Sequence, residues 1–149
     1  MNKLRQVNQE LAIAGQLTPS GLQEAAHSGF KSILNLRHPA EEGFLSNEQQ
    51  QAEARGLVYL NMPVTPDTID DDLTTSVLQQ IDELPKPLLV HCANGMRAGA
   101  MTLMQLATRN GMTAQDAFEM AGGIGFDCNA YPEMKQFFAH YVNTYSNPN

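Results

Sequence analysis

The stretch that most constrains the fold of this chain runs from residue 88 to residue 110. It reads as a short apolar strand, a tight loop that begins at Cys92 and ends at Arg97, and a helix that is apolar nearly all round. A helix of that kind has no face suited to water, so we expect it in the middle of the fold. The loop leads into the N-terminus of this helix, where backbone N–H groups and the helix dipole favour a bound anion.

Strands and helices alternate along the rest of the chain, which indicates an α/β fold. We expect a central, mainly parallel sheet of four to five strands flanked by helices. At 149 residues the chain is expected to form a single domain, residues 1–149. Expected strands cover residues 11–14, 32–37, 57–62 and 88–90, and expected helices cover 19–28, 47–55 behind a Ser46 cap, 70–84, 97–109, 114–120 and 131–145.

Composition and charge exclude several classes of partner and location. The formal net charge is −7 and no basic cluster occurs, which disfavours nucleic acid and membranes as partners. No run approaches the ~18–20 apolar residues of a membrane span. The first six residues lack the apolar core of a signal peptide, so a cytoplasmic location is expected. Cys92 and Cys128 are too few for a disulfide framework and show no metal-ligand spacing, so no metal or other cofactor is expected.

Cys92 is the candidate nucleophile. A cysteine after three apolar strand residues is usually a small buried hydrophobe, but the neighbouring residues favour a reactive thiolate here. Gly95 lets the backbone turn its N–H groups inward. Arg97 lies in the first helical turn, where a cation is unfavourable unless an anion lies between it and the helix end. Its planar fork suits a tetrahedral oxyanion, and His91 is expected to hydrogen-bond nearby backbone and fix the loop.

Several segments resemble a known group of enzymes. Residues 90–98, Val-His-Cys-Ala-Asn-Gly-Met-Arg-Ala, resemble the signature loop of cysteine-dependent protein phosphatases. Residues 32–37, Ser-Ile-Leu-Asn-Leu-Arg, resemble a strand of the dual-specificity branch, and residues 59–64 resemble the strand that leads to its general-acid loop. Together with Gly-Gln-Leu-Thr-Pro at residues 15–19, they make the chain most similar to the bacterial beta-lactamase-hydrolase-like, phosphatase-like family, from about residue 13 to about residue 127.

This resemblance implies a cysteine-phosphatase-like fold and hydrolysis of phosphate monoesters through a thiophosphoryl intermediate on Cys92, without a metal. The implied substrate is a phosphorylated small molecule or a phosphoprotein, with phosphotyrosine and dual specificity both included. The implied site binds a phosphate or sulfate anion with the Arg97 side chain and the backbone N–H groups of the loop. The residues expected to form it are Ala93, Asn94, Gly95, Met96, Arg97 and Ala98.

A phosphatase of this kind also needs an acid to protonate the leaving oxygen. The resemblance implies an Asp on the loop after the strand at residues 57–62, and Asp67 is the best match. Asp70 is a second candidate, although both residues also fit ordinary turn and helix-cap roles. Arg37 is expected to pair with Glu41 or Glu42.

Two departures from the phosphatase pattern keep other functions open. Four residues separate Cys92 from Arg97, whereas tyrosine phosphatases have five, and the shorter spacing resembles that of rhodanese-type sulfurtransferases. Ala98 stands where phosphatases usually have Ser or Thr, whose hydroxyl stabilises the departing thiolate. The alternatives are therefore a sulfurtransferase with a persulfide on Cys92, and a non-catalytic module that binds phosphorylated ligands. His38 and Asp127 are further candidates for the border of the cleft.

Overall fold

The computed structural model describes residues 4–146. Within this range five strands form one sheet in the order β1-β2-β5-β3-β4. Neighbouring strands from β2 to β4 are parallel, whereas β1 pairs antiparallel with β2 at one edge. The expected mainly parallel α/β sheet is thereby confirmed. The strands are β1 (Arg5–Gln6), β2 (Leu11–Ala14), β3 (Ser32–Asn35), β4 (Val58–Asn61) and β5 (Leu88–His91).

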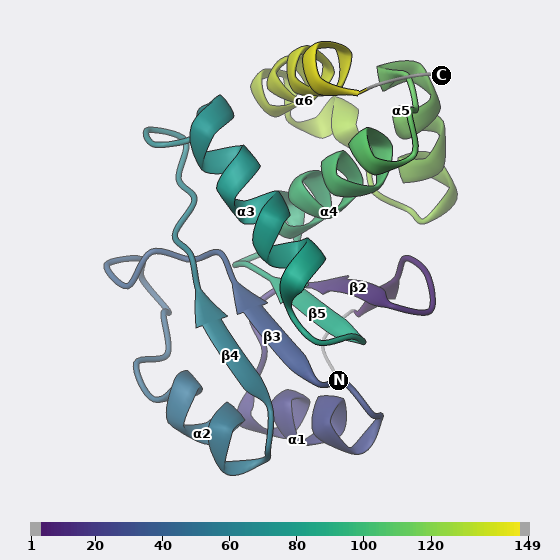
Figure 1. Ribbon diagram of the computed structural model, residues 1–149. Helices are drawn as coiled ribbons and strands as arrows, with labels where there is room; N and C mark the ends of the chain where they lie inside the picture. The colour runs from purple at the N-terminus through teal and green to yellow at the C-terminus, as the bar shows by residue number, and fades with distance from the viewer. Residues whose placement is uncertain (1–3, 147–149) are drawn as a thin grey trace.

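Helices cover both faces of the sheet (Figure 1). α1 and α2 lie on one face, and α3, α4, α5 and α6 lie on the other. Within residues 4–146 no helix is long and apolar enough to cross a bilayer. The helices are α1 (Pro19–His27), α2 (Glu48–Ala54), α3 (Asp71–Glu83), α4 (Met96–Arg109), α5 (Ala114–Gly123), the short 3-10 helix η1 (Cys128–Ala130) and α6 (Pro132–Tyr145).

The helix expected in the middle of the fold, α4, does lie there. It packs against β2 and β5 on one side and against α3, α5 and α6 on the others. Its residues from Ala98 to Met104 and Ala107 are all buried. β5 is equally central, between β2 and β3. The loop between β5 and α4 therefore starts from the middle of the sheet, at the carboxyl end of a parallel strand, where ligands bind in α/β folds.

Side chains at the end of β5 alternate between the two faces of the sheet. Leu88, Val90 and Cys92 belong to the apolar core under α4, whereas Leu89 belongs to the core under α1 and α2. His91 lies two positions after Leu89, so its side chain is on the same face of the sheet as that of Leu89. The histidine and the cysteine of the loop therefore face opposite layers of helices.

Some element boundaries differ from the expected ones. β3 ends at Asn35 because the Arg37 backbone N–H turns back to the Asn35 side chain (2.9 Å) instead of continuing the ladder. Ser46 does not cap α2: the cap position is Asn47, which makes no side-chain cap bond. The α2 boundary is instead held by a backbone bond from Glu48 N to Leu45 O (3.0 Å).

Close packing around α4 gives a direct test of the fold. A methyl group added at Gly99 would collide with the ring of Phe126, so we expect Gly99→Ala to lower the free energy of unfolding by about 1–3 kcal/mol through overpacking. Urea denaturation measures this change. Gly122→Ala is the matched control, because a methyl group there meets nothing within 4 Å. An unchanged stability for Gly99→Ala would contradict the packing of residue 126 against α4.

Candidate active site

The site forms where three parallel strands end side by side. Ala14 of β2 and Asn35 of β3 both pair with His91 of β5 across the sheet. The Cys92 backbone N–H then bonds to the Ala14 carbonyl (3.3 Å), which ties the start of the loop to the end of β2. Residues that are far apart in the sequence therefore meet at one edge of the sheet.

The Cys92 sulfur lies at the N-terminus of α4. It accepts hydrogen bonds from the backbone N–H groups of Gly95 (3.1 Å) and Ala98 (3.5 Å). Gly95 precedes the helix with a φ of +90°, a conformation that favours glycine. The inward turn of the N–H groups expected from this glycine is thus confirmed, but two of these groups contact the sulfur itself. Cys92 is fully buried, so its sulfur is not in contact with solvent in this structure.

The expected anion cradle was to use the N–H groups of residues 93 to 98, and only some of them are available for it. The Met96 N–H is taken by the Asn94 side chain (3.0 Å). The backbone N–H groups of Ala93, Asn94 and Arg97 have no hydrogen-bond partner among the described residues. They are therefore free to bind an anion at the positive end of α4.

The Arg97 guanidinium is held by Glu41, a partner that the sequence did not identify. Its two terminal nitrogens donate to the two Glu41 oxygens (2.7 and 2.9 Å), and one of them also donates to the Val64 carbonyl (2.8 Å). The hydrogen bond to Glu41 raises the pKa of Arg97 against the opposing effect of burial, and the neighbouring Cys92 contributes in the same direction as Glu41. Arg97 therefore stays a fixed cation beside the sulfur.

Glu41 is in turn held by the loop that follows β3. It accepts from Arg37 Nε (3.2 Å) and from the His38 backbone N–H (2.7 Å). The hydrogen bond from Arg97, with these two bonds, holds the pKa of Glu41 at about 2 although burial acts to raise it. The expected pairing of Arg37 with Glu41 is confirmed. The His38 ring is exposed, accepts from the Ala40 N–H (2.9 Å) and borders none of the cavities described below.

His91 contacts the backbone as expected and also a carboxylate that the sequence did not identify. Its Nδ1 lies 3.3 Å from the Cys92 carbonyl oxygen. Its Nε2 lies 2.6 Å from Oε2 of Glu48, and both side chains are buried. Burial raises the pKa of Glu48, but the hydrogen bonds from His91, Tyr59 and Gln16 and the charge of His91 outweigh it and leave the pKa lowered.

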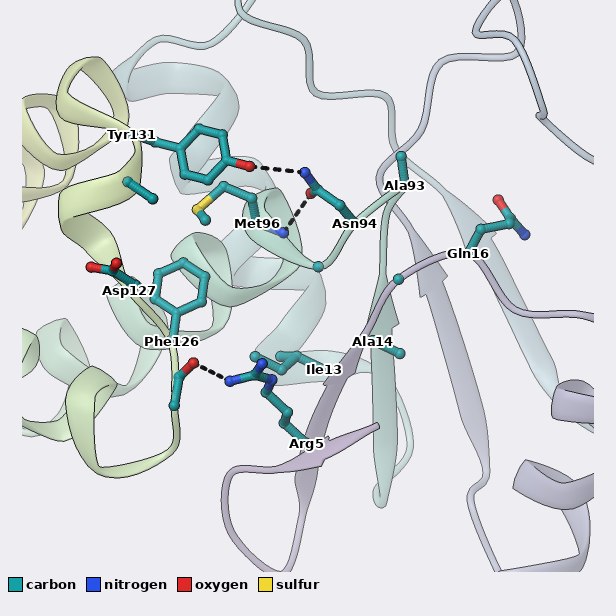
Figure 2. A pocket seen from close by; sticks show the side chains of 14 residues that line it. Arg5, Ile13, Ala14, Gln16, Ala93, Asn94, Met96, Phe126, Asp127 and Tyr131 are labelled. Atoms are coloured by element: carbon teal, nitrogen blue, oxygen red, sulfur yellow. Dashed lines mark hydrogen bonds between the residues drawn. The ribbon is translucent and has the colours of Figure 1, made fainter. Parts of the chain in front are cut away.

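Two cavities border the loop. A groove of ≈ 840 Å³ contains Arg97 and Glu41 on its wall. A second cavity of ≈ 500 Å³ lies toward β2 and the segment 125–127 (Figure 2). The Asn94 side chain donates to the Tyr131 hydroxyl (3.2 Å), and this pair borders both cavities. The walls of the groove are mostly apolar: Pro66, Ile69, Met96, Ala130, Tyr131, Pro132, Met134 and Phe137.

Neither candidate acid lines these cavities. Asp67 is exposed on a turn over residues 65–69, although its neighbours Thr65 and Pro66 do line the groove. The Asp70 carboxylate accepts from the Leu73 N–H (2.8 Å) and caps α3. Asp127, expected at the border of the cleft, lines the second cavity and caps η1.

Cys128 lies apart from the loop, next to Lys135 and Phe118 in a third cavity. Both cysteines are free thiols. Burial raises the pKa of the Cys128 thiol. Within residues 4–146 no three His, Cys, Asp or Glu side chains lie close enough to hold a metal ion.

Comparison with known proteins identifies a matching family. The sequence model described as "Beta-lactamase hydrolase-like protein, phosphatase-like domain" matches residues 3–109. A curated beta-lactamase hydrolase-like protein from Agrobacterium fabrum is 30% identical over 150 residues, which cover 91% of this chain and 35% of that protein. The chain spans about a third of the length of the curated relatives it matches.

Solved structures share the fold at low sequence identity. Pseudomonas aeruginosa TpbA in complex with pTyr is 20% identical, with a TM-score of 0.68 over 93% of this chain and 82% of that one. The core catalytic domain of the PP-IP phosphatase SIW14 from S. cerevisiae, in complex with citrate, is 19% identical, with a TM-score of 0.72 over 95% and 88%. These similarities show that the fold is that of the cysteine phosphatases.

The ion pair between Glu41 and Arg97 predicts a pH dependence of stability. The folded-state pKa of Glu41, about 2, is below its usual 4.5, so the carboxylate contributes stability that is complete above pH ~4.5 and lost as the pH falls toward 2. We expect the free energy of unfolding of the wild type to exceed that of Glu41→Gln by a constant amount at pH ~6–8. The difference then narrows below pH ~4.5, which urea denaturation at each pH measures.

The matched control for this experiment is Glu119→Gln, on the exposed side of α5. Its stability relative to the wild type is expected to stay the same at every pH. A difference for Glu41→Gln that persists unchanged down to pH ~3 would contradict the ion pair.

Proposed function

Because the chain belongs to the phosphatase-like domain family of beta-lactamase hydrolase-like proteins, we propose that it hydrolyses phosphate monoesters with Cys92 as the nucleophile. The observation that carries the proposal is the position of the Cys92 sulfur at the N-terminus of α4, where it accepts two backbone N–H bonds. Backbone N–H groups at a helix N-terminus are typical surroundings of nucleophilic cysteines. The Arg97 guanidinium is a neighbour of the sulfur and can balance the charge of a bound phosphoryl group.

In the first step the loop opens and the phosphoryl group enters the cradle. Its oxygens accept from the free N–H groups of Ala93, Asn94 and Arg97, and the Arg97 side chain balances their charge. The sulfur attacks phosphorus in line, the phosphorus–oxygen bond to the leaving group breaks, and a thiophosphate forms on Cys92. Asp67 protonates the leaving oxygen when its turn, which adjoins the groove at Thr65 and Pro66, moves over the substrate.

In the second step water attacks the thiophosphate, inorganic phosphate leaves and the Cys92 thiolate is regenerated. Ala98 has no hydroxyl to stabilise that departing thiolate. The second step is therefore slow relative to the first, and product from the first turnover accumulates in a burst.

Replacing the nucleophile tests this function. We expect Cys92→Ser to lower the rate of p-nitrophenyl phosphate hydrolysis by at least ~10³-fold. Binding of tungstate, measured by calorimetry, is expected to persist because the cradle is built from backbone. Cys128→Ser is the control, since Cys128 lies in another cavity, and keeps the wild-type rate. A wild-type rate for Cys92→Ser would reject the proposal.

The acid is tested by a comparison of leaving groups. Asp67→Asn is expected to slow hydrolysis of an alkyl phosphate by ~10²–10⁴-fold and to leave p-nitrophenyl phosphate little changed, because nitrophenolate departs without a proton. Asp70→Asn, which keeps a capping side chain for α3, is expected to change neither rate. A loss in Asp70→Asn but not in Asp67→Asn would assign the acid to Asp70.

A second candidate function is sulfur transfer through a persulfide on Cys92. The four-residue spacing between Cys92 and Arg97 and the lack of a hydroxyl at Ala98 favour it. A thiosulfate:cyanide assay beside the phosphatase assay separates the two activities. Tight tungstate binding with neither activity and no burst would instead identify a module that only binds phosphorylated ligands.

A further inference from the structure

We propose, on the basis of the function proposed above, that Glu48 is a positioning residue that holds both Cys92 and Arg97 in place from the opposite face of the sheet. Glu48 is the first residue of α2 and is only 1% exposed. It touches neither Cys92 nor the cavities beside the loop. Its carboxylate acts through two chains of hydrogen bonds, one to each side of the site.

The carboxylate is surrounded by donors. Its Oε2 accepts from His91 Nε2 (2.6 Å), from the Tyr59 hydroxyl (2.9 Å) and from Asn35 Nδ2 (3.3 Å). Its Oε1 accepts from Gln16 Nε2 (2.6 Å). All four partners donate, so the residue in the middle must be an acceptor on both oxygens. A carboxylate fits this arrangement and an amide does not.

The first chain runs through His91 to the nucleophile. One ring nitrogen faces Glu48 and the other lies 3.3 Å from the carbonyl oxygen of Cys92. Contacts at both ring nitrogens fix the orientation of the imidazole. Glu48 thereby holds, through His91, the peptide group of Cys92, and so keeps the sulfur in line with the backbone N–H groups of Gly95 and Ala98.

The second chain runs through Gln16 to the arginine. Gln16 is one of the residues that line the second cavity (Figure 2), and its Oε1 accepts from Arg37 Nη1 (2.7 Å). Arg37 donates to Glu41, which holds Arg97 by two bonds. The Gln16 backbone N–H also bonds to the Ala93 carbonyl (3.0 Å) inside the loop. A substitution at Glu48 is therefore expected to displace Arg97 and the loop N–H groups that bind the anion, as well as the Cys92 sulfur.

The test compares Glu48→Gln with the matched control Glu53→Gln, which makes the same change at an exposed position of α2. All variants carry Cys128→Ser so that Cys92 is the one thiol. Three quantities are measured: kcat and KM for p-nitrophenyl phosphate, the pH profile of Cys92 alkylation by iodoacetamide, and tungstate affinity. We expect Glu48→Gln to lower kcat by ~10–100-fold, to shift alkylation to higher pH and to weaken tungstate binding. Glu53→Gln is expected to match the wild type.

Two further variants test the two chains of hydrogen bonds one at a time. Gln16→Ala breaks the chain to Arg97, so we expect it to weaken tungstate binding and leave the alkylation profile in place. His91→Asn breaks the chain to Cys92, so we expect the alkylation profile to shift and tungstate affinity to stay near the wild-type value. These variants also test the proposal if Glu48→Gln does not fold.

The proposal is overturned if Glu48→Gln only lowers thermal stability, with kcat, alkylation and tungstate affinity as in the wild type. It is also overturned if Gln16→Ala leaves tungstate affinity unchanged and His91→Asn leaves the alkylation profile unchanged. Alkylation and tungstate binding do not depend on turnover. If the Cys128→Ser parent and the Glu53→Gln control also fail to hydrolyse p-nitrophenyl phosphate while these two readouts shift as expected in the other variants, the phosphatase function is wrong and the role of Glu48 stands.

Discussion

The site depends on the alternation of side chains at the end of the central strand. His91 and Cys92 are adjacent in the chain, and the pleat of β5 sends them to opposite faces of the sheet. The sulfur therefore reaches the N-terminus of α4, while the imidazole reaches the carboxylate of Glu48 under α2. The peptide group between His91 and Cys92 thus connects the sulfur, on the face of the sheet that α4 covers, to the buried polar side chains around Glu48 on the opposite face.

Electrostatics on the reactive side are organised around two fixed cations and one carboxylate. Arg37 and Arg97 both bond to Glu41, and the low pKa of Glu41 keeps this group ionised. Because burial makes unpaired charges unfavourable, each cation is held by the carboxylate or by backbone carbonyls. The loop that follows β3 is therefore part of the site, although none of its residues is a nucleophile or an acid.

Much of this arrangement was predictable, and the reasons are local. The apolar runs, the glycines and the capping residues Thr18 and Asp70 act over a few positions, so they reveal most strands and helices. The cysteine and arginine of the loop are recognisable because they flank one turn between a strand and a helix. The contact of Glu41 with Arg97 and that of Glu48 with His91 gave no such signal, since an acidic residue in a loop or at a helix start is common. The one available clue was the alternation of side chains along the strands, which puts His91 and Asn35 on the sheet face that α2 covers. Buried polar side chains on that face need hydrogen-bond partners.

The sequence alone therefore determined the layered α/β fold, the central place of α4 and the loop between Cys92 and Arg97, because each follows from hydrophobic periodicity and short-range turn chemistry. The tertiary structure decided which distant side chains meet that loop. It paired Arg97 with Glu41 and His91 with Glu48, it buried the sulfur, and it left Asp67 outside the groove. These outcomes depend on how parallel strands align at their carboxyl ends and how helices pack on each face, which no local pattern encodes.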